Sequence, residues 1–273
     1  MKWKTVGYFT LITNKNMGRG PVVQARKDAV NAVKGKIFSL HAKLIAIACA
    51  KGGDPEKNPS LAAAIYTAKK AGVPNDNIDR AIKKGTGEDK DALQISEIVY
   101  EGYAPGGVAL MVSTLTDNKN RTVSNIRHIF SKYGGNLGES GAVSWMFHKK
   151  GVIFIDPQKY NYDDIEEKLY ELEGLEDVIV EKDYIKIILD VENFHESQKS
   201  LENMGIESLE SKIDFIPEND TQLTEFDHVL KFKKMIQAFH EDEDVNIVSS
   251  NEVISADLEA EVEDFIQKNT FRT

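Results

Sequence analysis

The chain has 273 residues, of which 41% are hydrophobic and 29% are charged, and its formal net charge is −10 at neutral pH. This balance is typical of a globular protein and excludes a disordered chain, while the length favours two or three domains. No stretch approaches the roughly 18 consecutive apolar residues of a membrane span, and a single cysteine excludes a disulfide framework and a cysteine-based zinc site within one chain.

The charge is divided unevenly along the chain. Residues 1–90 contain 17 Lys and Arg against 7 Asp and Glu, residues 91–150 contain 6 against 5, and residues 151–273 contain 11 against 32. This asymmetry predicts contact with a polyanion at the basic end, because the acidic remainder repels the same partner. The alternative is that each sign of charge solvates the surface of its own domain.

The first residues differ from those that follow. Residues 1–16 contain Lys2, Lys4 and Lys15 and no acidic residue. Their apolar part is too short for a secretory signal and has no arginine, so we expect an extension ahead of the patterned sequence.

The segment from Val22 to about Ala50 has the spacing of an amphipathic helix. Lys36 and Lys43 are seven residues apart and are expected on its exposed face. Gly35 is a candidate break into two helices. A small buried residue is the interpretation we favour for the cysteine at position 49. The predicted apolar face consists of Val30, Val33, Ile37, Leu44 and Ala48.

Two shorter helices follow. Asn58-Pro59 provides an N-cap and a first-turn proline for a helix over residues 61–71, and a third helix fits residues 75–84. The first domain is therefore predicted to be a helical bundle with its lysines outside and with Phe38 and Tyr66 in its core.

After residue 88 the periodicity changes to that of β-strands. Strands are predicted over residues 97–103, 108–114 and 142–147, with a helix over residues 120–133. One face of this helix is predicted to be a polar stripe of Arg121, Asn125, His128 and Lys132.

Residues 151–210 follow the order βαββαβ, which is the ferredoxin-like arrangement. The later segments 214–217, 223–239 and 245–249 are assigned back to the sheet that begins at residue 97. The predicted fold class is thus α+β, with a helical bundle and then two α+β domains, the ferredoxin-like one inserted in the other. The predicted parts are an extension (1–16), a basic helical domain (17–90), a discontinuous α+β domain (91–150 plus 211–250), an acidic ferredoxin-like domain (151–210) and an acidic tail (251–273).

Motifs for catalysis are not apparent. The glycines at Gly85-Thr86-Gly87 and Pro105-Gly106-Gly107 lack the strand and helix context of a phosphate-binding loop, and the six histidines form no HExxH pattern. The run Glu241–Asp244 is expected to be a solvated surface loop, since its adjacent carboxylates repel one another. We predict a protein that is not an enzyme and uses no cofactor or metal.

Cationic side chains are the candidate binding residues. Lys and Arg contacts to phosphate supply most sequence-independent affinity, and few base-reading side chains accompany them here, so recognition of backbone and shape is predicted. The predicted nucleic-acid-binding residues are Arg19, Arg26, Lys27, Lys34, Lys36, Lys43, Lys69, Lys70, Lys83, Lys84 and Arg121.

Over about residues 17–250 the chain resembles the YebC/PmpR family. The motifs that support this are Lys34-Gly35-Lys36-Ile37-Phe38, Gly52-Gly53-Asp54-Pro55 with Asn58-Pro59, Val73-Pro74-Asn75-Asp76-Asn77-Ile78, Ala81-Ile82-Lys83-Lys84-Gly85-Thr86-Gly87-Glu88, Tyr100-Glu101-Gly102-Tyr103-Ala104-Pro105-Gly106-Gly107-Val108, Leu115-Thr116-Asp117-Asn118-Lys119-Asn120-Arg121-Thr122 and Phe130-Ser131-Lys132-Tyr133-Gly134-Gly135-Asn136-Leu137-Gly138. Many members begin with Gly-His-Ser-Lys-Trp, whereas this chain has Met17-Gly18-Arg19, a start that resembles a subset of the family.

The resemblance implies a helical N-terminal domain and two α+β domains around a cleft. It also implies a DNA-binding transcriptional regulator without a cofactor. The single cysteine suits a reducing compartment, so we expect a cytoplasmic protein. The alternative that the resemblance leaves open is a translation factor, similar to the mitochondrial translational activator of cytochrome c oxidase, that relieves ribosome stalling at difficult, proline-rich sequences. The implied partner is therefore DNA, or ribosomal RNA together with ribosomal proteins, and no membrane.

Overall fold

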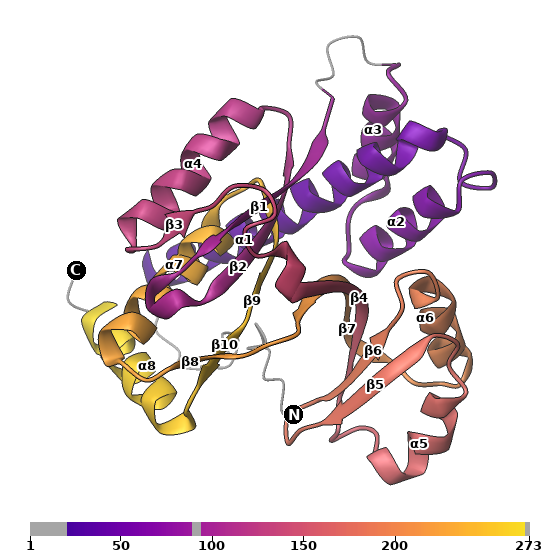
Figure 1. Ribbon diagram of the computed structural model, residues 1–273. Coiled ribbons are helices and arrows are strands. Elements are labelled where there is room, and N and C mark those ends of the chain that lie inside the picture. The colour runs from indigo at the N-terminus through magenta and orange to yellow at the C-terminus, as the bar shows by residue number, and fades with distance from the viewer. Residues whose placement is uncertain (1–20, 89–93, 271–273) are drawn as a thin grey trace.

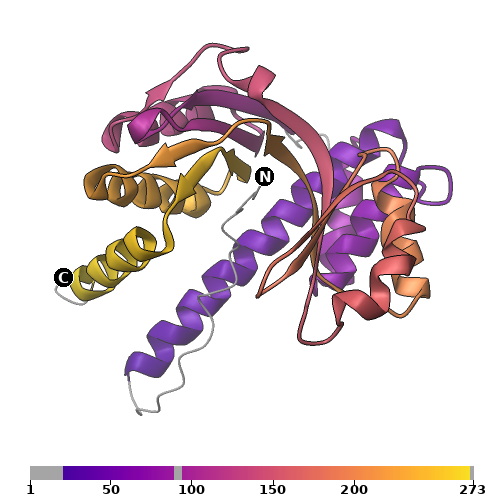
Figure 2. The same ribbon diagram turned by 60° about the horizontal axis from the view of Figure 1, so that its bottom comes forward.

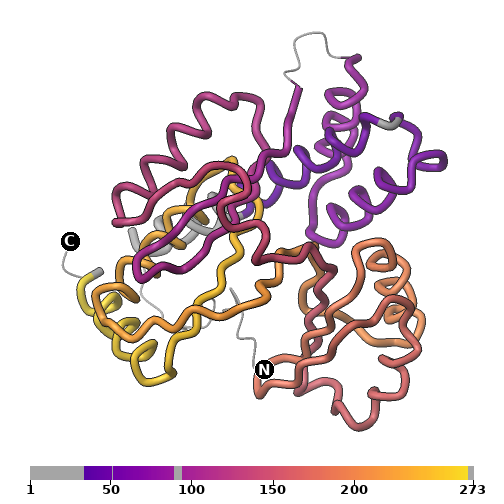
Figure 3. The backbone as a smooth tube through the Cα atoms, viewed as in Figure 1, coloured from indigo at the N-terminus to yellow at the C-terminus, as the bar shows by residue number. Residues whose placement is uncertain are grey.

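The computed structural model describes residues 21–88 and 94–270, with side chains from Lys34 onward except those of Lys51 and Thr270. Figure 1 shows a helical bundle, a first sheet covered by helices, and a second sheet with its own helices. The backbone runs from the first sheet into the second and returns to the first (Figure 3). Among the described helices, none has the length and apolar character needed to cross a membrane.

The bundle consists of α1 (Pro21–Ala48), α2 (Pro59–Lys70) and α3 (Asn75–Gly85), with a short 3-10 turn, η2 (Cys49–Lys51), after α1. Asn58 joins two of these helices. Its side-chain oxygen accepts a hydrogen bond from the Leu61 N–H (3.2 Å), and its amide donates to the carbonyls of Ala48 (2.8 Å) and Gly52 (2.7 Å). The predicted N-cap therefore also satisfies carbonyl groups at the end of α1.

Helix α1 is continuous through Gly35, so the predicted break is wrong. The predicted apolar face is also displaced. Ile37 is 38% exposed, while the bundle core contains the fully buried Ile45 and the buried Cys49, with Phe38 packed against them. The buried position of the cysteine and the packing of Phe38 are confirmed.

The two helical glycines predict stability changes of opposite sign. A Cβ at Gly85 would lie 2.5 Å from the Ala46 carbonyl oxygen and 2.6 Å from the Cys49 Cβ, whereas a Cβ at Gly35 meets nothing within 4 Å. We expect Gly85→Ala to lower the free energy of unfolding by about 1–3 kcal/mol, because α1 and α3 must separate. Gly35→Ala is expected to raise it by about 0.5–1 kcal/mol. Urea unfolding of both variants checks this, and a stable Gly85→Ala protein would contradict the close packing.

The first sheet is antiparallel, in the order β3-β1-β2-β9. Helices α4 and α7 pack on one of its faces, with the Phe130 and Phe239 rings 5.2 Å apart in an edge-to-face contact. Figure 2 shows this sheet, α7 and α8 as successive layers. The return of the late strand to this sheet is confirmed. The elements are β1 (Ser96–Tyr103), β2 (Ala109–Thr116), α4 (Lys119–Lys132), β3 (Asn136–Leu137), α7 (Phe226–Glu241), β9 (Val245–Ser250) and α8 (Ala256–Thr270), with a small parallel pair β8 (Thr221–Leu223) and β10 (Glu252–Ile254).

The second sheet is antiparallel, in the order β5-β6-β4-β7. This is the ferredoxin-like order of a βαββαβ unit, so the predicted α+β fold class is confirmed. Its elements are β4 (Phe147–Ile155), α5 (Tyr162–Tyr170), β5 (Leu175–Val180), β6 (Ile185–Leu189), α6 (Phe194–Asn203) and β7 (Ser208–Pro217).

Two predicted strands differ from the structure. Residues 214–217 belong to β7 and pair with β4, not with the first sheet, because β4 and β7 continue as a long ladder from Phe147↔Pro217 onward. Residues 142–147 do not form a separate strand; they contain a 3-10 turn, η4 (Ser144–Met146), just before β4. We propose the same division into parts as above, with the inserted unit extended to residues 147–217.

Candidate nucleic-acid interface

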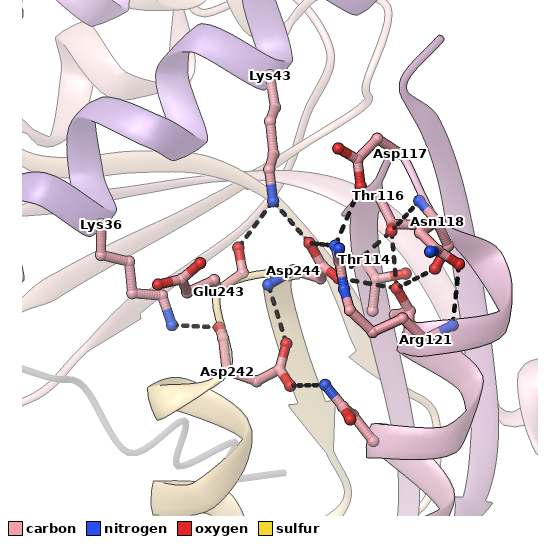
Figure 4. A network of polar contacts seen from close by, with 12 residues as sticks. Lys36, Lys43, Thr114, Thr116, Asp117, Asn118, Arg121, Asp242, Glu243 and Asp244 are labelled. Atoms are coloured by element: carbon pink, nitrogen blue, oxygen red, sulfur yellow. Dashed lines mark hydrogen bonds and ion pairs between the residues drawn. The ribbon is translucent and has the colours of Figure 1, made fainter. Parts of the chain in front are cut away.

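The predicted cationic residues fall into distinct groups, of which the first surrounds Asp244 (Figure 4). Asp244 follows α7 and is only 4% exposed. Its carboxylate accepts hydrogen bonds from Lys43 Nζ of α1 (2.8 Å), from Arg121 of α4 (3.0 Å) and from the hydroxyls of Thr122 (2.8 Å) and Thr116 (3.3 Å). We call these five residues the Asp244 cluster.

Backbone carbonyls of the same loop bind the two lysines of α1. Lys36 donates to the carbonyl of Asp242 (2.6 Å) and to that of His240, and Lys43 donates to the carbonyl of Glu243 (2.9 Å). The Asp244 carbonyl accepts the Leu115 N–H of β2 (2.8 Å). Helix α1 is thus fastened to the loop between α7 and β9.

Burial and the neighbouring polar and charged groups have opposite effects on the pKa values of Asp244 and Lys36. Burial by itself raises the pKa of Asp244, but hydrogen bonds from Lys43, Thr122 and Arg121 outweigh it, so the pKa of this carboxyl is lowered. Burial is the main reason why the pKa of Lys36 is also lowered, against the attraction of Asp242. Asp244 therefore stays ionised and neutralises cations that a phosphate would otherwise contact.

These contacts correct two predictions. Lys36 and Lys43 do lie away from the bundle core, but that side of α1 is covered by the loop after α7 and by β2, so they are not on an exposed face. The acidic run is not wholly solvated either. Glu241 and Glu243 are exposed, whereas Asp242 is half-buried and Asp244 is buried.

A second group of cations is exposed at the ends of the bundle helices. Lys34, Lys69, Lys83 and Lys84 are exposed, and across residues 34–88 and 94–269 no ion pair involves them. Lys70 is exposed but pairs with Glu202 of α6 at 3.2 Å. Of the remaining candidates, Arg19 lies outside the residues that the structure describes. Arg26 and Lys27 belong to α1, but the structure does not describe their side chains.

The exposed lysines do not form one line. Lys69 lies in the last turn of α2, and Lys83 and Lys84 occupy the last turn of α3. The end of α3 packs beside the segment that precedes α2, since a Cβ on Gly53 would touch Thr86. The two lysine groups therefore lie at opposite ends of α2, about 18 Å apart for a helix of its length. That separation suits contact with several phosphates along a backbone rather than one compact anion.

Some surface residues were placed wrongly or missed from the sequence. Tyr66 is about half exposed rather than in the core, and its hydroxyl donates to Glu202. On α4, Lys119 and Arg127 are exposed beside the predicted stripe, of which Asn125 donates to Asp242 (3.2 Å). The predicted stripe followed a single helical spacing; considering every cation in the sequence of α4 would have identified Lys119 and Arg127 as well.

Other sites have little to offer a charged ligand. The described part of the chain contains no group of three or more His, Cys, Asp or Glu that could hold a metal ion. A hollow of about 290 Å³ beside β5 is lined by Tyr170, Leu175, Glu176 and Asp177 among others. Its two carboxylates would repel a phosphate.

Comparisons with known proteins agree along the chain. Residues 21–88 match the model of the TACO1/YebC protein N-terminal domain, and residues 95–252 match that of the TACO1/YebC second and third domain. A probable transcriptional regulatory protein of Halothermothrix orenii is 42% identical over 242 residues, covering 88% of this chain and 95% of its own. One of Maridesulfovibrio salexigens is 45% identical over 244 residues, covering 89% and 96%. The crystal structure of a conserved hypothetical protein of Aquifex aeolicus superposes with a TM-score of 0.78 at 39% identity, covering 91% of this chain and 98% of the other.

Proposed function

This chain belongs to the TACO1/YebC family, and we propose that it is a transcriptional regulatory protein that binds DNA, without catalysing a reaction, through exposed lysines of its N-terminal bundle. The relatives named above supply the regulatory role. The contacting residues that we propose are Lys69, Lys83 and Lys84. Lys34 and the exposed Lys119 and Arg127 of α4 extend this surface.

The observation on which this proposal rests is that some of the predicted cations are bound by protein groups and others are not. Lys36, Lys43 and Arg121 are bound by the acidic loop. Lys69, Lys83 and Lys84 are exposed and, among the residues that the structure describes, have no ion pair. Exposed lysines contact phosphates without first losing a protein partner, so they provide affinity that depends on salt and little on sequence.

The acidic remainder of the protein supports the same orientation. Residues 151–273 contain 11 Lys and Arg against 32 Asp and Glu. Repulsion from this part directs a nucleic acid toward the bundle and opposes coating of the whole surface.

A salt titration of the full-length protein tests the proposal. With three phosphates contacted, the logarithm of the association constant for duplex DNA should fall with the logarithm of salt concentration with a slope of about −2.7. A promoter fragment, a random duplex of equal length and purified ribosomes are compared by fluorescence anisotropy and co-sedimentation. Binding to ribosomes without binding to either duplex would replace DNA by ribosomal RNA as the partner, and binding to none would refute the proposal.

A further inference from the structure

Two exposed aromatic side chains share one carbonyl group on the loop that leads into β4. Trp145 is 66% exposed and Tyr103 is 37% exposed. The Trp145 indole N–H donates to the Ala142 carbonyl oxygen (3.3 Å), and the Tyr103 hydroxyl donates to the same oxygen (3.2 Å). The two rings are therefore neighbours, each with its polar atom turned toward the protein.

The loop that holds them is anchored by a buried carboxylate. Glu101 of β1 is 6% exposed, and its side chain accepts the backbone N–H groups of Gly141 (2.9 Å), Val143 (2.9 Å) and Ser144 (2.8 Å). Burial raises the pKa of Glu101, but these donors outweigh it and the pKa is lowered. A carboxylate with three backbone donors fixes the loop backbone on either side of Ala142.

The outward position of Trp145 is built into the local structure. Val143, Met146 and Phe147 pack into a small core with Ala109 and Met111, so the residues around the tryptophan are held inward. Large apolar side chains gain by burial, yet the largest one in this loop is turned to solvent, with its indole N–H bonded to the Ala142 carbonyl. Rigid exposed aromatics are suited to stack on another flat group.

One exposed lysine is close to Trp145 in sequence. Lys149 is exposed on β4, four residues after Trp145. The loop also contains the exposed Glu139. An exposed aromatic surface with a lysine nearby in sequence suits a base and a neighbouring phosphate of a single strand.

We propose that Trp145 and Tyr103 form a stacking surface for an unpaired nucleobase of a single-stranded nucleic acid. This proposal rests on the proposed function and extends it, since it adds a second contact distant in sequence from the bundle lysines. Stacking engages the ring faces and is tolerant of sequence, so no particular base is required.

Tryptophan fluorescence tests this stacking directly, because the chain has few tryptophans. Trp3 and Trp145 are its two tryptophans, so Trp3→Phe leaves one fluorescent reporter. Poly(dT) and poly(U) oligonucleotides are expected to quench this fluorescence, whereas a duplex of the same length is not. Trp145→Ala is expected to weaken single-strand binding roughly 5- to 150-fold, with Trp145→Phe retaining most of it. Duplex binding through the lysines should be unchanged.

The outcomes separate the two proposals. Duplex binding with neither quenching nor loss of single-strand affinity in Trp145→Ala would overturn the stacking surface and leave the proposed function standing. Absence of binding to any polymer would overturn both. A fluorescence change that depends on protein concentration without nucleic acid would identify a contact between copies of the chain and also overturn stacking. Because Trp145 is mostly exposed, Trp145→Ala is expected to unfold at the urea concentration of the parent.

Discussion

Replacing Asp244 by Asn is expected to lower the free energy of unfolding by about 3 kcal/mol. Asn has nearly the same volume but no charge, so Lys43 and Arg121 lose their common counter-ion. Breaking a buried ion pair by removal of one partner costs about 3–5 kcal/mol. The lower end of that range applies because the Lys43 side chain is 17% exposed and that of Arg121 is 51% exposed.

Urea unfolding of the full chain measures this change. Glu243→Gln is the matched control, because it also removes one negative charge from the same loop but alters an exposed side chain whose residue contributes its carbonyl to Lys43. We expect this control to remain within about 0.5 kcal/mol of the parent. Equal stability of the two variants would show that the Asp244 cluster does not hold α1 in place.

The pH dependence follows from the lowered pKa of Asp244. Its pKa is lower in the folded than in the unfolded chain, so its contribution to stability is complete above the unfolded value of about 3.9 and is lost as pH falls through the folded value. The difference in unfolding free energy between the parent and Asp244→Asn should therefore shrink below about pH 4. A difference that stays constant down to low pH would contradict an ionised Asp244.

The combined change Lys69→Gln, Lys83→Gln and Lys84→Gln is expected to weaken duplex DNA binding on the order of 100- to 1,000-fold at low salt. Each phosphate contact contributes about 1 to 1.5 kcal/mol. The slope of log affinity against log salt should become shallower by about 2.7, roughly 0.9 per lysine, and the loss should be similar for promoter and random DNA. Glutamine avoids placing negative charge at the C-terminal end of a helix, where it destabilises.

A triple variant of the acidic unit provides the control for total charge. Lys168, Lys182 and Lys199 are exposed and, in the part of the chain that the structure describes, have no ion pair. Their replacement by Gln changes the net charge equally and should leave DNA affinity within about twofold, since this surface is repelled by phosphate. A similar loss in both triple variants would mean that overall charge, not the bundle lysines, determines binding.

Lys36 and Lys43 are unsuitable for such a test. The sequence alone predicts that reversing them together with Lys83 and Lys84 abolishes polyanion binding without unfolding the chain. In the structure they hold the loop after α7 through its carbonyl groups and Asp244, so a negative charge at either position would detach α1. A loss of binding in that variant would report on folding as well as on contact.

Secondary structure was largely predictable because it depends on neighbouring residues. The helix starting at Asn58-Pro59, the alternation of the strands and the βαββαβ order all follow from spacing within short windows. The buried face of α1 differs from the predicted one because the helix is covered on two sides, by α2 and α3 and by the loop after α7. The lysines opposite the bundle core are therefore not on an open surface.

What the sequence by itself determined was the class of fold, its order of elements and the concentration of basic residues at one end. The tertiary structure alone decided which cations remain exposed, since Lys43 and Asp244 are 201 residues apart and meet only when β9 returns to the first sheet. It also decided that Trp145 faces solvent: in the predicted strand it would share a face with Val143 and Phe147, whereas the turn at η4, held by Glu101, directs it outward. Burial and ion pairing are properties of packed surfaces, and these come from parts of the chain that local spacing does not relate.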